Sequence, residues 1–277
     1  MKQKKIVYRN LIEENILEKL LGISNGHSII HHGSWRAIRQ ALGDELDLDE
    51  WFGALEERLG MDGSLVVPTF TYCFKRSQGD YEIFDPGRSQ AKIGALADAF
   101  WRHPEVIRTA SPTHSFAIWG AITRDISADN SPTSPLGRGS VLDWLAYQEN
   151  SYILLAGVDF SSLSFGHYLE VLASVPWVDY SPWEYMHVLP IGASVHGDQP
   201  LCEIPGCAKG FLELQKEMEQ QGLIQPILIN SVNFFYIPIK CLLDFGIQFF
   251  RENAFRLLCP AETCVPCDAR RRKFLPV

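Results

Sequence analysis

Residues 152–175, YILLAGVDFSSLSFGHYLEVLASV, indicate the fold more clearly than any other stretch of the chain. Residues 152–158 are apolar throughout, which is typical of a strand buried inside a sheet. Residues 165–175 have the apolar spacing of a helix, and they carry His167 and Glu170 three positions apart. Both side chains therefore lie on one face of that helix. Because open α/β sheets place their sites at the carboxyl ends of strands, this strand–turn–helix unit predicts a site.

Similar units precede it along the chain. Residues 27–32 have strand length and are followed by Gly33, Ser34 and a helical pattern through residue 42. A helix over residues 48–59 leads into a strand over 64–67. Strands and helices alternate through residue 175, which predicts an α/β sheet with helices on both faces. The last hundred residues are less regular. Since no linker divides the chain, we expect a single domain over residues 1–277, with a cysteine-containing tail at 259–277.

Composition excludes several classes of protein. The chain has 277 residues, of which 46% are hydrophobic and 21% charged, as in globular proteins. Its net charge of −8 disfavours nucleic-acid binding, and the basic stretches 2–5 and 270–273 are expected to be solvated tails. Polar residues and prolines interrupt the most apolar stretch, residues 223–250, so no membrane span is expected. No signal peptide is evident and cysteines are sparse, which predicts a cytoplasmic protein.

His167 and Glu170 are the first candidate catalytic pair. A histidine is the usual general base near neutral pH. A carboxylate one turn away can fix the imidazole tautomer or hold a cationic group of a substrate. The alternative is an ordinary His–Glu pair on a helix surface. The serines between the strand and the helix, at the expected site, favour the catalytic interpretation.

Two other polar segments are candidates for binding an anion. Residues 108–115, RTASPTHS, combine a cation, hydroxyl groups and His114, a set that suits a phosphate; the alternative is a polar turn before a strand. Residues 31–36, HHGSWR, place Ser34 and Arg36 at the start of a helix, where backbone N–H groups attract anions. Neither GxGxxG nor GxxxxGK[ST] occurs, which disfavours dinucleotide redox chemistry and nucleotide hydrolysis.

Three cysteines, Cys259, Cys264 and Cys267, have the spacing C-x4-C-x2-C. Such a group can begin a zinc or iron–sulfur site, and Cys202, Cys207 and Cys241 are the available fourth ligands. The RRRK sequence that follows favours an exposed C-terminal extension instead. We therefore predict no metal and retain these three cysteines as the weaker candidates.

Seven segments in this order resemble the aminoglycoside 3-N-acetyltransferase family: HHGSWRAI (31–38), GSLVVPTFT (63–71), FDP (84–86) with IGALADAFW (93–101), VIRTASPTHSFAIWG (106–120), SPLGRGSVLDWL (134–145), YILLAGV (152–158) and GHYLEVLASVPW (166–177). The resemblance covers about residues 10–180, with a weaker trace through 237–250. It implies an acetyl-CoA-dependent N-acetyltransferase with an α/β/α fold distinct from that of the GNAT enzymes.

The resemblance also implies roles for individual residues. His167 matches the base that deprotonates the acceptor amine, and Glu170 matches the nearby acid. Acetyl transfer would be direct, with the oxyanion stabilised near Thr69 or Ser164. For the acceptor side it implies His114 and Asp85. For coenzyme A it implies the set Ser34, Trp35, Arg36, Thr69, Arg108 and Ser115.

The chain departs from the family pattern at two places. The antibiotic-modifying members usually read RSxHPxxS where this chain has RTASPTHS, so Ser111 replaces their first histidine. Residues 137–145, GRGSVLDWL, are more similar to relatives from cell-surface polysaccharide pathways. We therefore expect a nucleotide-linked amino sugar as acceptor, with an aminoglycoside antibiotic as the alternative. Transfer of another acyl or imidoyl group, or a non-catalytic binding or assembly role, are further alternatives. The aromatic residues of 176–186 suggest a homodimer.

Overall fold

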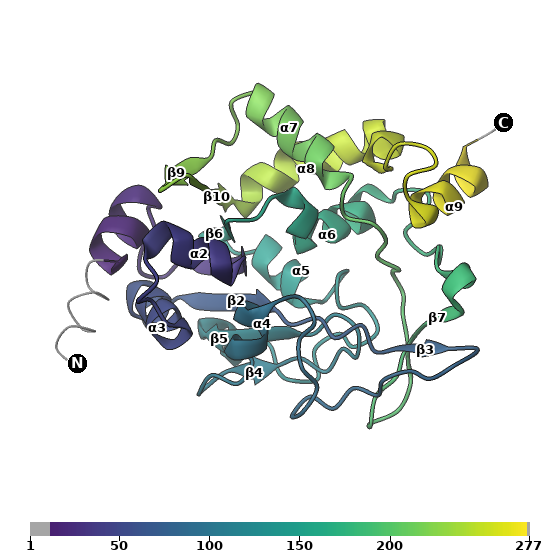
Figure 1. Ribbon diagram of the computed structural model, residues 1–277, viewed down its shortest axis with the longest axis horizontal. Helices are drawn as coiled ribbons and strands as arrows, with labels where there is room; N and C mark the ends of the chain where they lie inside the picture. The colour runs from purple at the N-terminus through teal and green to yellow at the C-terminus, as the bar shows by residue number, and fades with distance from the viewer. Residues whose placement is uncertain (1–11, 276–277) are drawn as a thin grey trace.

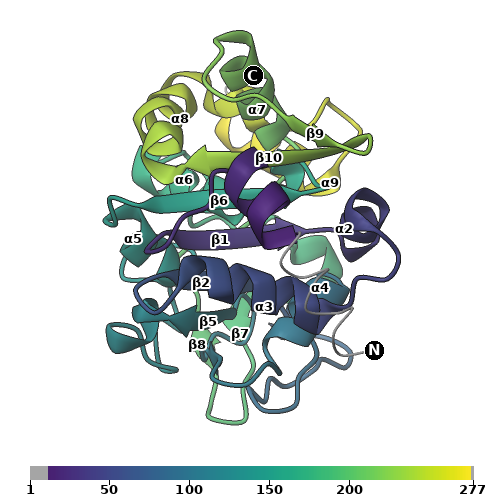
Figure 2. The same cartoon turned by 90° about the vertical axis from the view of Figure 1, so that its left-hand side faces the viewer.

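The computed structural model describes residues 12–275, which are built around one seven-stranded sheet. Its strand order is β4-β5-β2-β1-β6-β10-β9, and Figure 2 shows the strands from β10 to β5 one above the other. The three central strands β1, β2 and β6 are parallel to one another, and the outer strands run antiparallel to their neighbours. The strands are β1 (Ser28–Gly33), β2 (Ser64–Pro68), β4 (Ile107–Arg108), β5 (Phe116–Gly120), β6 (Ser151–Ala156), β9 (Ile227–Ile229) and β10 (Val232–Pro238).

Helices cover both faces of this sheet (Figures 1 and 2) because successive strand residues point to opposite sides. Ile29 and Leu154 pack with one group of helices, whereas Ile30 and Ile153 pack with the other. The first group is η1 (Ile12–Leu20), α2 (Trp35–Leu42), α3 (Leu48–Leu59) and α4 (Ala95–Phe100). The second is α5 (Val141–Ala146), α6 (Ser164–Ala173), α7 (Phe211–Gln220), α8 (Ile239–Asn253) and α9 (Val265–Phe274). The predicted α/β/α layering is confirmed.

Local sequence accounts for where the helices near the site begin. Asp47 and Glu50 form a capping box that starts α3 at the predicted residue. The Ser34 hydroxyl accepts a hydrogen bond from the Ala37 N–H and starts α2. Helix α6 has no side-chain cap at its N-terminus, so the first N–H groups of this helix have no side-chain partner. Its end is marked by Ser174 in the left-handed conformation.

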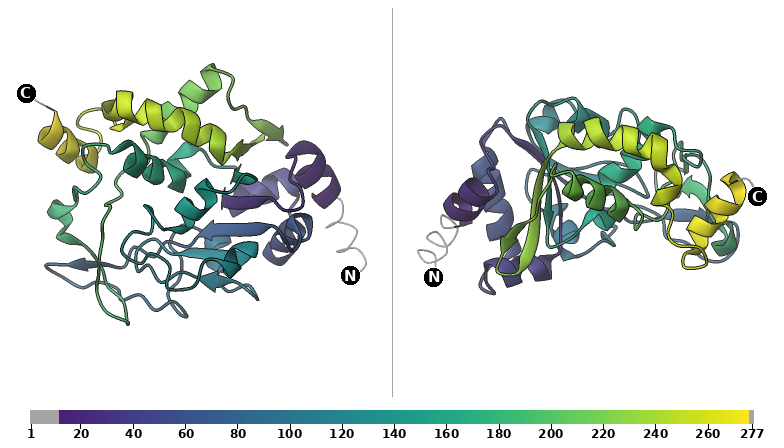
Figure 3. Two further views of the ribbon diagram at one scale, coloured as in Figure 1. Left: turned by 180° about the vertical axis from the view of Figure 1, so that it is seen from behind. Right: turned by 90° about the horizontal axis from the view of Figure 1, so that it is seen from above.

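A second, small sheet forms beside the main one. It contains β3 (Phe74–Arg76), β7 (Val188–Gly192) and β8 (Gln199–Pro200), with β3 and β8 antiparallel to β7. Strand β3 is too short to give a periodic signal in the sequence. The views of Figure 3 complete the arrangement and place the C-terminal helix α9 at the opposite end of the molecule from η1.

The C-terminal hundred residues are more regular than the sequence indicates. They supply α7, α8, α9 and strand β10, which pairs with β6 in the main sheet. The predicted exposed extension is wrong, because Cys259 and Cys267 are buried. The prediction that residues 270–273 are a solvated tail is wrong at Arg270. This residue is only 1% exposed, since α9 turns its side chain toward the protein. The basic stretch 2–5 lies outside the described residues.

The aromatic segment 176–186 is only partly at the surface. Trp177 is fully buried, which corrects the expectation that its aromatic residues are exposed, whereas Tyr185 is 52% exposed. The homodimer stays a prediction. Within residues 12–275, none of the helices has both the length and the apolar character needed to cross a membrane.

Candidate active site

A cavity of about 400 Å³ opens at the carboxyl ends of the three parallel strands. His32 and Gly33 from the end of β1, and Val67 and Pro68 from the end of β2, line one part of it. The residues between β6 and α6 line another part. This position is where open α/β sheets bind ligands, and it is the position that residues 152–175 predict.

His167 and Glu170 come together at this cavity. Nδ1 of His167 lies 2.8 Å from Oε2 of Glu170, and the His167 side chain is 11% exposed. Helix α6 positions both residues one turn apart, and His167 lines the cavity while Glu170 lies behind it. Gly166 lets this part of α6 pack closely, because a Cβ there would lie 2.2 Å from the Phe211 ring. Phe211 in turn meets the His167 ring edge-on, with centroids 5.0 Å apart.

Glu170 is held by two further side chains. Its Oε1 accepts a hydrogen bond of 2.9 Å from Nε1 of Trp177, and the Arg270 guanidinium lies 3.7 Å from the same oxygen. Burial raises the pKa of Glu170, but the hydrogen bond with His167, the charge of Arg270 and the bond from Trp177 outweigh burial. The pKa of Glu170 therefore lies below its usual range, and the group is a carboxylate at neutral pH.

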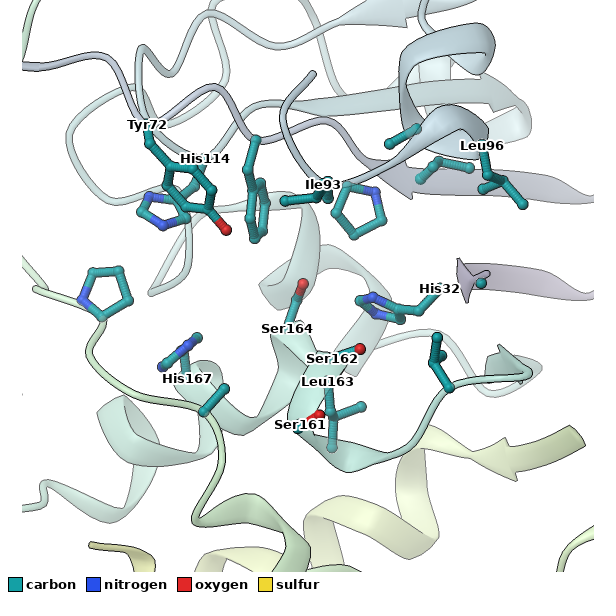
Figure 4. Close-up of a pocket in the computed structure, with 18 of the residues that line it drawn as sticks. His32, Tyr72, Ile93, Leu96, His114, Ser161, Ser162, Leu163, Ser164 and His167 are labelled. Carbon is teal, nitrogen blue, oxygen red and sulfur yellow. The ribbon is translucent and has the colours of Figure 1, made fainter. Parts of the chain in front are cut away.

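This carboxylate decides which nitrogen of His167 can act as a base. An ionised carboxylate only accepts hydrogen bonds, so Nδ1 of the neutral imidazole carries the proton. Nε2 then has a free lone pair on the side of the ring that is not bonded to Glu170. Figure 4 shows His167 across the cavity from His114 and Tyr72, with Ser164 to one side. The arrangement can accept a proton from a ligand in the cavity.

His114 also lines the cavity, as expected for a residue on the acceptor side. Its ring lies edge-on to Phe70 and Tyr72, and its Nδ1 is 2.9 Å from the Thr113 hydroxyl. Burial, together with the nearby His167 imidazole, lowers the pKa of His114 to about 3. His114 is therefore a neutral polar group in the cavity and a poor proton acceptor at neutral pH.

Two histidines at the end of β1 have different environments. Nε2 of His31 accepts a hydrogen bond from the Trp51 indole, and burial lowers the pKa of His31 to about 4. Nε2 of His32, by contrast, is buried and has no hydrogen-bond partner in the described part of the chain. Burial and the neighbouring His31 lower the pKa of His32 to about 3. A buried polar atom without a partner beside a cavity is suited to contact a ligand.

Thr69, Arg108 and Ser115, which the resemblance implies as coenzyme A contacts, are not among the residues that line the cavity, and their contact with coenzyme A stays a prediction. Nε of Arg108 donates to the Ser115 hydroxyl and Nη2 donates to the Thr69 carbonyl, while the Thr69 hydroxyl lies 3.0 Å from that of Ser115. The guanidinium is buried between the Phe84 and Trp101 rings, and burial lowers the pKa of Arg108 to about 10. The polar groups of these residues form hydrogen bonds with one another inside the protein, and these bonds hold the segment before β5 in place.

The other residues predicted to contact the acceptor or coenzyme A lie in two places. Asp85 is also outside the cavity lining, where its carboxylate accepts a hydrogen bond from the Gly87 N–H in a turn. Ser34, Trp35 and Arg36 form the N-terminus of α2, directly after the cavity residue Gly33. Arg36 is exposed there and Trp35 is half-buried.

Several cavity residues were not predicted. Phe70, Tyr72 and Phe74 form an aromatic wall, and their position just after a strand is a signal that the sequence does contain. Trp183, Pro205, Gly206 and Ala208 reach the cavity from distant parts of the chain, for which no local pattern exists. Among the described residues that line the cavity, none is an Asp, Glu, Lys or Arg.

The predicted cysteines lie outside the cavity. Cys259, Cys264 and Cys267 come together with Cys207, whereas Cys202 and Cys241 do not join them. The sequence leaves three cysteines open as the fourth member of this group, and the structure brings Cys207 to it.

Comparison with known proteins places this chain in a family. A family model described as aminoglycoside 3-N-acetyltransferase matches residues 30–251. Aminoglycoside N(3)-acetyltransferase IV from Salmonella sp is 34% identical over 214 residues, which cover 73% of this chain and 74% of that protein.

Solved structures share the fold. The apoenzyme of aminoglycoside acetyltransferase AAC(3)-IVa superposes with a TM-score of 0.74 at 23% identity, covering 97% of this chain and 96% of the other. AAC-IIIb in a binary complex with CoASH has a TM-score of 0.70 at 20% identity, covering 88% and 96%. The chain belongs to the aminoglycoside 3-N-acetyltransferase family and is an N-acetyltransferase that uses acetyl-CoA.

Proposed function

We propose that the protein transfers the acetyl group of acetyl-CoA directly to the amine of an amino sugar, with His167 as the general base. The observation that carries this proposal is the contact between Nδ1 of His167 and Glu170 at the wall of the cavity. It fixes the tautomer in which Nε2 can accept a proton. A base positioned in this way contributes about 10²–10⁴-fold to the rate.

The reaction needs one proton transfer at His167. Nε2 takes a proton from the acceptor amine as its nitrogen attacks the thioester carbonyl. The tetrahedral intermediate then releases the coenzyme A thiolate and leaves an amide on the sugar. The proton on His167 passes to the thiolate or to water, which regenerates the neutral imidazole. Glu170 keeps its charge throughout and stabilises the transient imidazolium.

The N-terminus of α6 is the best-placed oxyanion site. Its first N–H groups have no side-chain cap, and Ser164 at its start lines the cavity. We favour this site over Thr69, the other residue considered for this role, because the Thr69 hydroxyl is bonded to Ser115 inside the protein. N–H and hydroxyl groups aimed at a developing negative charge are a common means of lowering acyl-transfer barriers.

Coenzyme A would bind along the side of the cavity formed by the end of β1 and by α4. We place its phosphates at the N-terminus of α2, near Ser34 and Arg36, where the helix dipole and backbone N–H groups attract anions. Ile93 and Leu96 provide an apolar surface for the pantetheine arm on the way to His167. His114 and the unpartnered His32 remain as polar contacts for the ligands.

We further propose that the acceptor is a nucleotide-linked amino sugar and that the reaction is cytoplasmic. The described residues that line the cavity include no carboxylate to compensate the several ammonium groups of an aminoglycoside, whereas the amino sugar itself carries a single amine. The lining includes no lysine or arginine either, so the diphosphate of such an acceptor would have to lie outside it. An aminoglycoside antibiotic is the second candidate, and it is favoured by the 34% identity to the Salmonella protein.

Calorimetric titration with acetyl-CoA, followed by a screen of acceptors, tests this proposal. We expect micromolar binding of acetyl-CoA and faster release of free thiol with nucleoside-diphosphate amino sugars than with aminoglycosides. Arg36→Ala should weaken acetyl-CoA binding, whereas Arg251→Ala, at an exposed arginine on α8, should not. Rapid turnover of aminoglycosides alone would reject the amino-sugar assignment but keep the chemistry. Absence of acetyl-CoA binding would reject the proposed function.

A further inference from the structure

Four cysteines converge behind the active site. Cys207 precedes α7, Cys259 follows the short helix η5 (Ala254–Leu257), Cys264 precedes α9, and Cys267 lies in the first turn of α9. Their four sulfur atoms all lie within 4.8 Å of one another, and those of Cys207 and Cys259 are 3.5 Å apart. Within residues 12–275, this is the one such grouping of three or more residues suited to hold a metal ion.

The separations fit one tetrahedral metal ion. Zinc–sulfur bonds of about 2.3 Å place the four sulfurs of a tetrahedral site about 3.8 Å apart. A four-iron cluster requires its cysteines to be farther apart, because the cluster itself lies between them. A disulfide would join only two of the sulfurs, whereas here four converge on one point. Four soft thiolate ligands in a tetrahedral arrangement favour Zn²⁺.

The surroundings are those of a closed, structural site. Cys259 and Cys267 are buried, and Cys207 and Cys264 are half-buried. The segment between the ligands is held by hydrogen bonds from the Arg271 guanidinium to the Cys259 carbonyl, at 2.6 Å, and from the Glu262 N–H to Asp268, at 3.1 Å. Four protein ligands leave no open position for a substrate.

The ligands belong to the same segments that support the active site. Cys207 stands between Gly206 and Ala208, which both line the cavity. Arg270 lies three residues after Cys267 on α9, and its guanidinium approaches Glu170 to 3.7 Å. The guanidinium also packs against Gly206, because a Cβ at that residue would lie 2.4 Å from Cζ. A metal ion at the four sulfurs would therefore tie one cavity wall to the helix that supports the Glu170 carboxylate.

We propose that Cys207, Cys259, Cys264 and Cys267 bind one structural Zn²⁺, which fixes α9 and residues 205–208 behind the His167–Glu170 pair. Zinc binding does not depend on the proposed function. The effect of zinc on acetyl transfer, by contrast, rests on the proposed function. Without the metal, the four metal–sulfur bonds that join these segments would be absent, and α9 would be held less firmly against the protein.

Metal analysis of the untagged protein, purified without added metal, tests the site directly. We expect about one zinc ion per chain by inductively coupled plasma mass spectrometry. Cys207→Ser and Cys264→Ser should lower the zinc content sharply, whereas Cys202→Ser, at an exposed cysteine outside the cluster, should retain it. Wild-type protein without zinc, or with stoichiometric iron and a visible colour, would overturn the proposal.

A second measurement keeps the test valid if the serine variants fail to fold. Unfolded wild-type protein refolded with Co²⁺ should show the thiolate-to-cobalt charge-transfer and strong visible bands of a tetrahedral site. Removal of zinc by a chelator should lower the melting temperature, and added Zn²⁺ should restore it. Octahedral cobalt spectra, or a melting temperature that the chelator does not change, would contradict a structural zinc site. Both results are independent of acetyltransferase activity.

Discussion

Nδ1 of His167 lies 2.8 Å from Oε2 of Glu170, and this contact connects the cavity to the buried side of α6. The other carboxylate oxygen of Glu170 receives the Trp177 indole and faces Arg270. Each of these groups has a defined partner, so the imidazole has one preferred orientation and one preferred tautomer. The site is therefore organised before any ligand binds.

Glu170→Gln tests the control of this tautomer. The amide N–H₂ of the new side chain can donate to Nδ1, which would move the imidazole proton to Nε2 and block the base. We expect kcat to fall by about 10²–10⁴, the range seen when a catalytic histidine loses its carboxylate partner or its function as a base. Steady-state kinetics measure the effect, with Glu213→Gln on the surface of α7 as the control. A kcat equal to that of the wild type would contradict the assigned role of Glu170.

Gly206→Ala tests the close contact between the cavity wall and α9. The added Cβ would lie 2.4 Å from Cζ of the buried Arg270, so the guanidinium must move away from Glu170. We expect a loss of stability of about 1–3 kcal/mol, as for other overpacked sites. Chemical denaturation measures it. Gly87→Ala, whose Cβ would meet only an ordinary contact at 3.5 Å, should leave the stability unchanged.

Three buried histidines predict a loss of stability in acid. Burial lowers the pKa of His31 to about 4 and the pKa values of His32 and His114 to about 3, from an ordinary value of 6.5. Between pH 6.5 and these values the unfolded chain binds protons that the folded chain does not, so stability falls as the pH falls. Each histidine contributes a slope of about 1 kcal/mol per pH unit.

Urea denaturation at several pH values measures this slope. His32→Asn should give a shallower dependence over the same window, because one group no longer gains a proton on unfolding. Stability that stays constant from pH 7 to pH 4 would show that these histidines are not neutral in the folded protein.

The sequence allowed the layers and the pairing of His167 with Glu170 to be predicted, because both depend on local patterns. The apolar run 152–158 and the spacing of His167 and Glu170 on the next helix are contained in one stretch of the chain. Composition alone does not give the surroundings of Arg108: a cation among hydroxyl groups has the same composition whether it faces a ligand or, as here, the Thr69 carbonyl and the Ser115 hydroxyl.

Long-range contacts account for most of what could not be predicted. Cys207 lies far along the chain from Cys259, and only the folded structure brings the two sulfurs to 3.5 Å. The burial of Arg270 also depends on a long-range contact. Arg270 belongs to the basic stretch 270–273, which suggests a solvated tail, but its side chain is buried against Glu170. Local periodicity carries no information on which distant segments meet, and this is why the support of the active site was missed.

The most direct test of the central claim is the turnover of His167→Ala with acetyl-CoA and its best acceptor. Removal of the base should lower kcat by about 10²–10⁴, while calorimetry should show nearly unchanged binding of acetyl-CoA. His196→Ala, at an exposed histidine outside the cavity, should behave as the wild type. A kcat for His167→Ala close to that of the wild type would contradict the claim that His167 takes the proton from the acceptor amine.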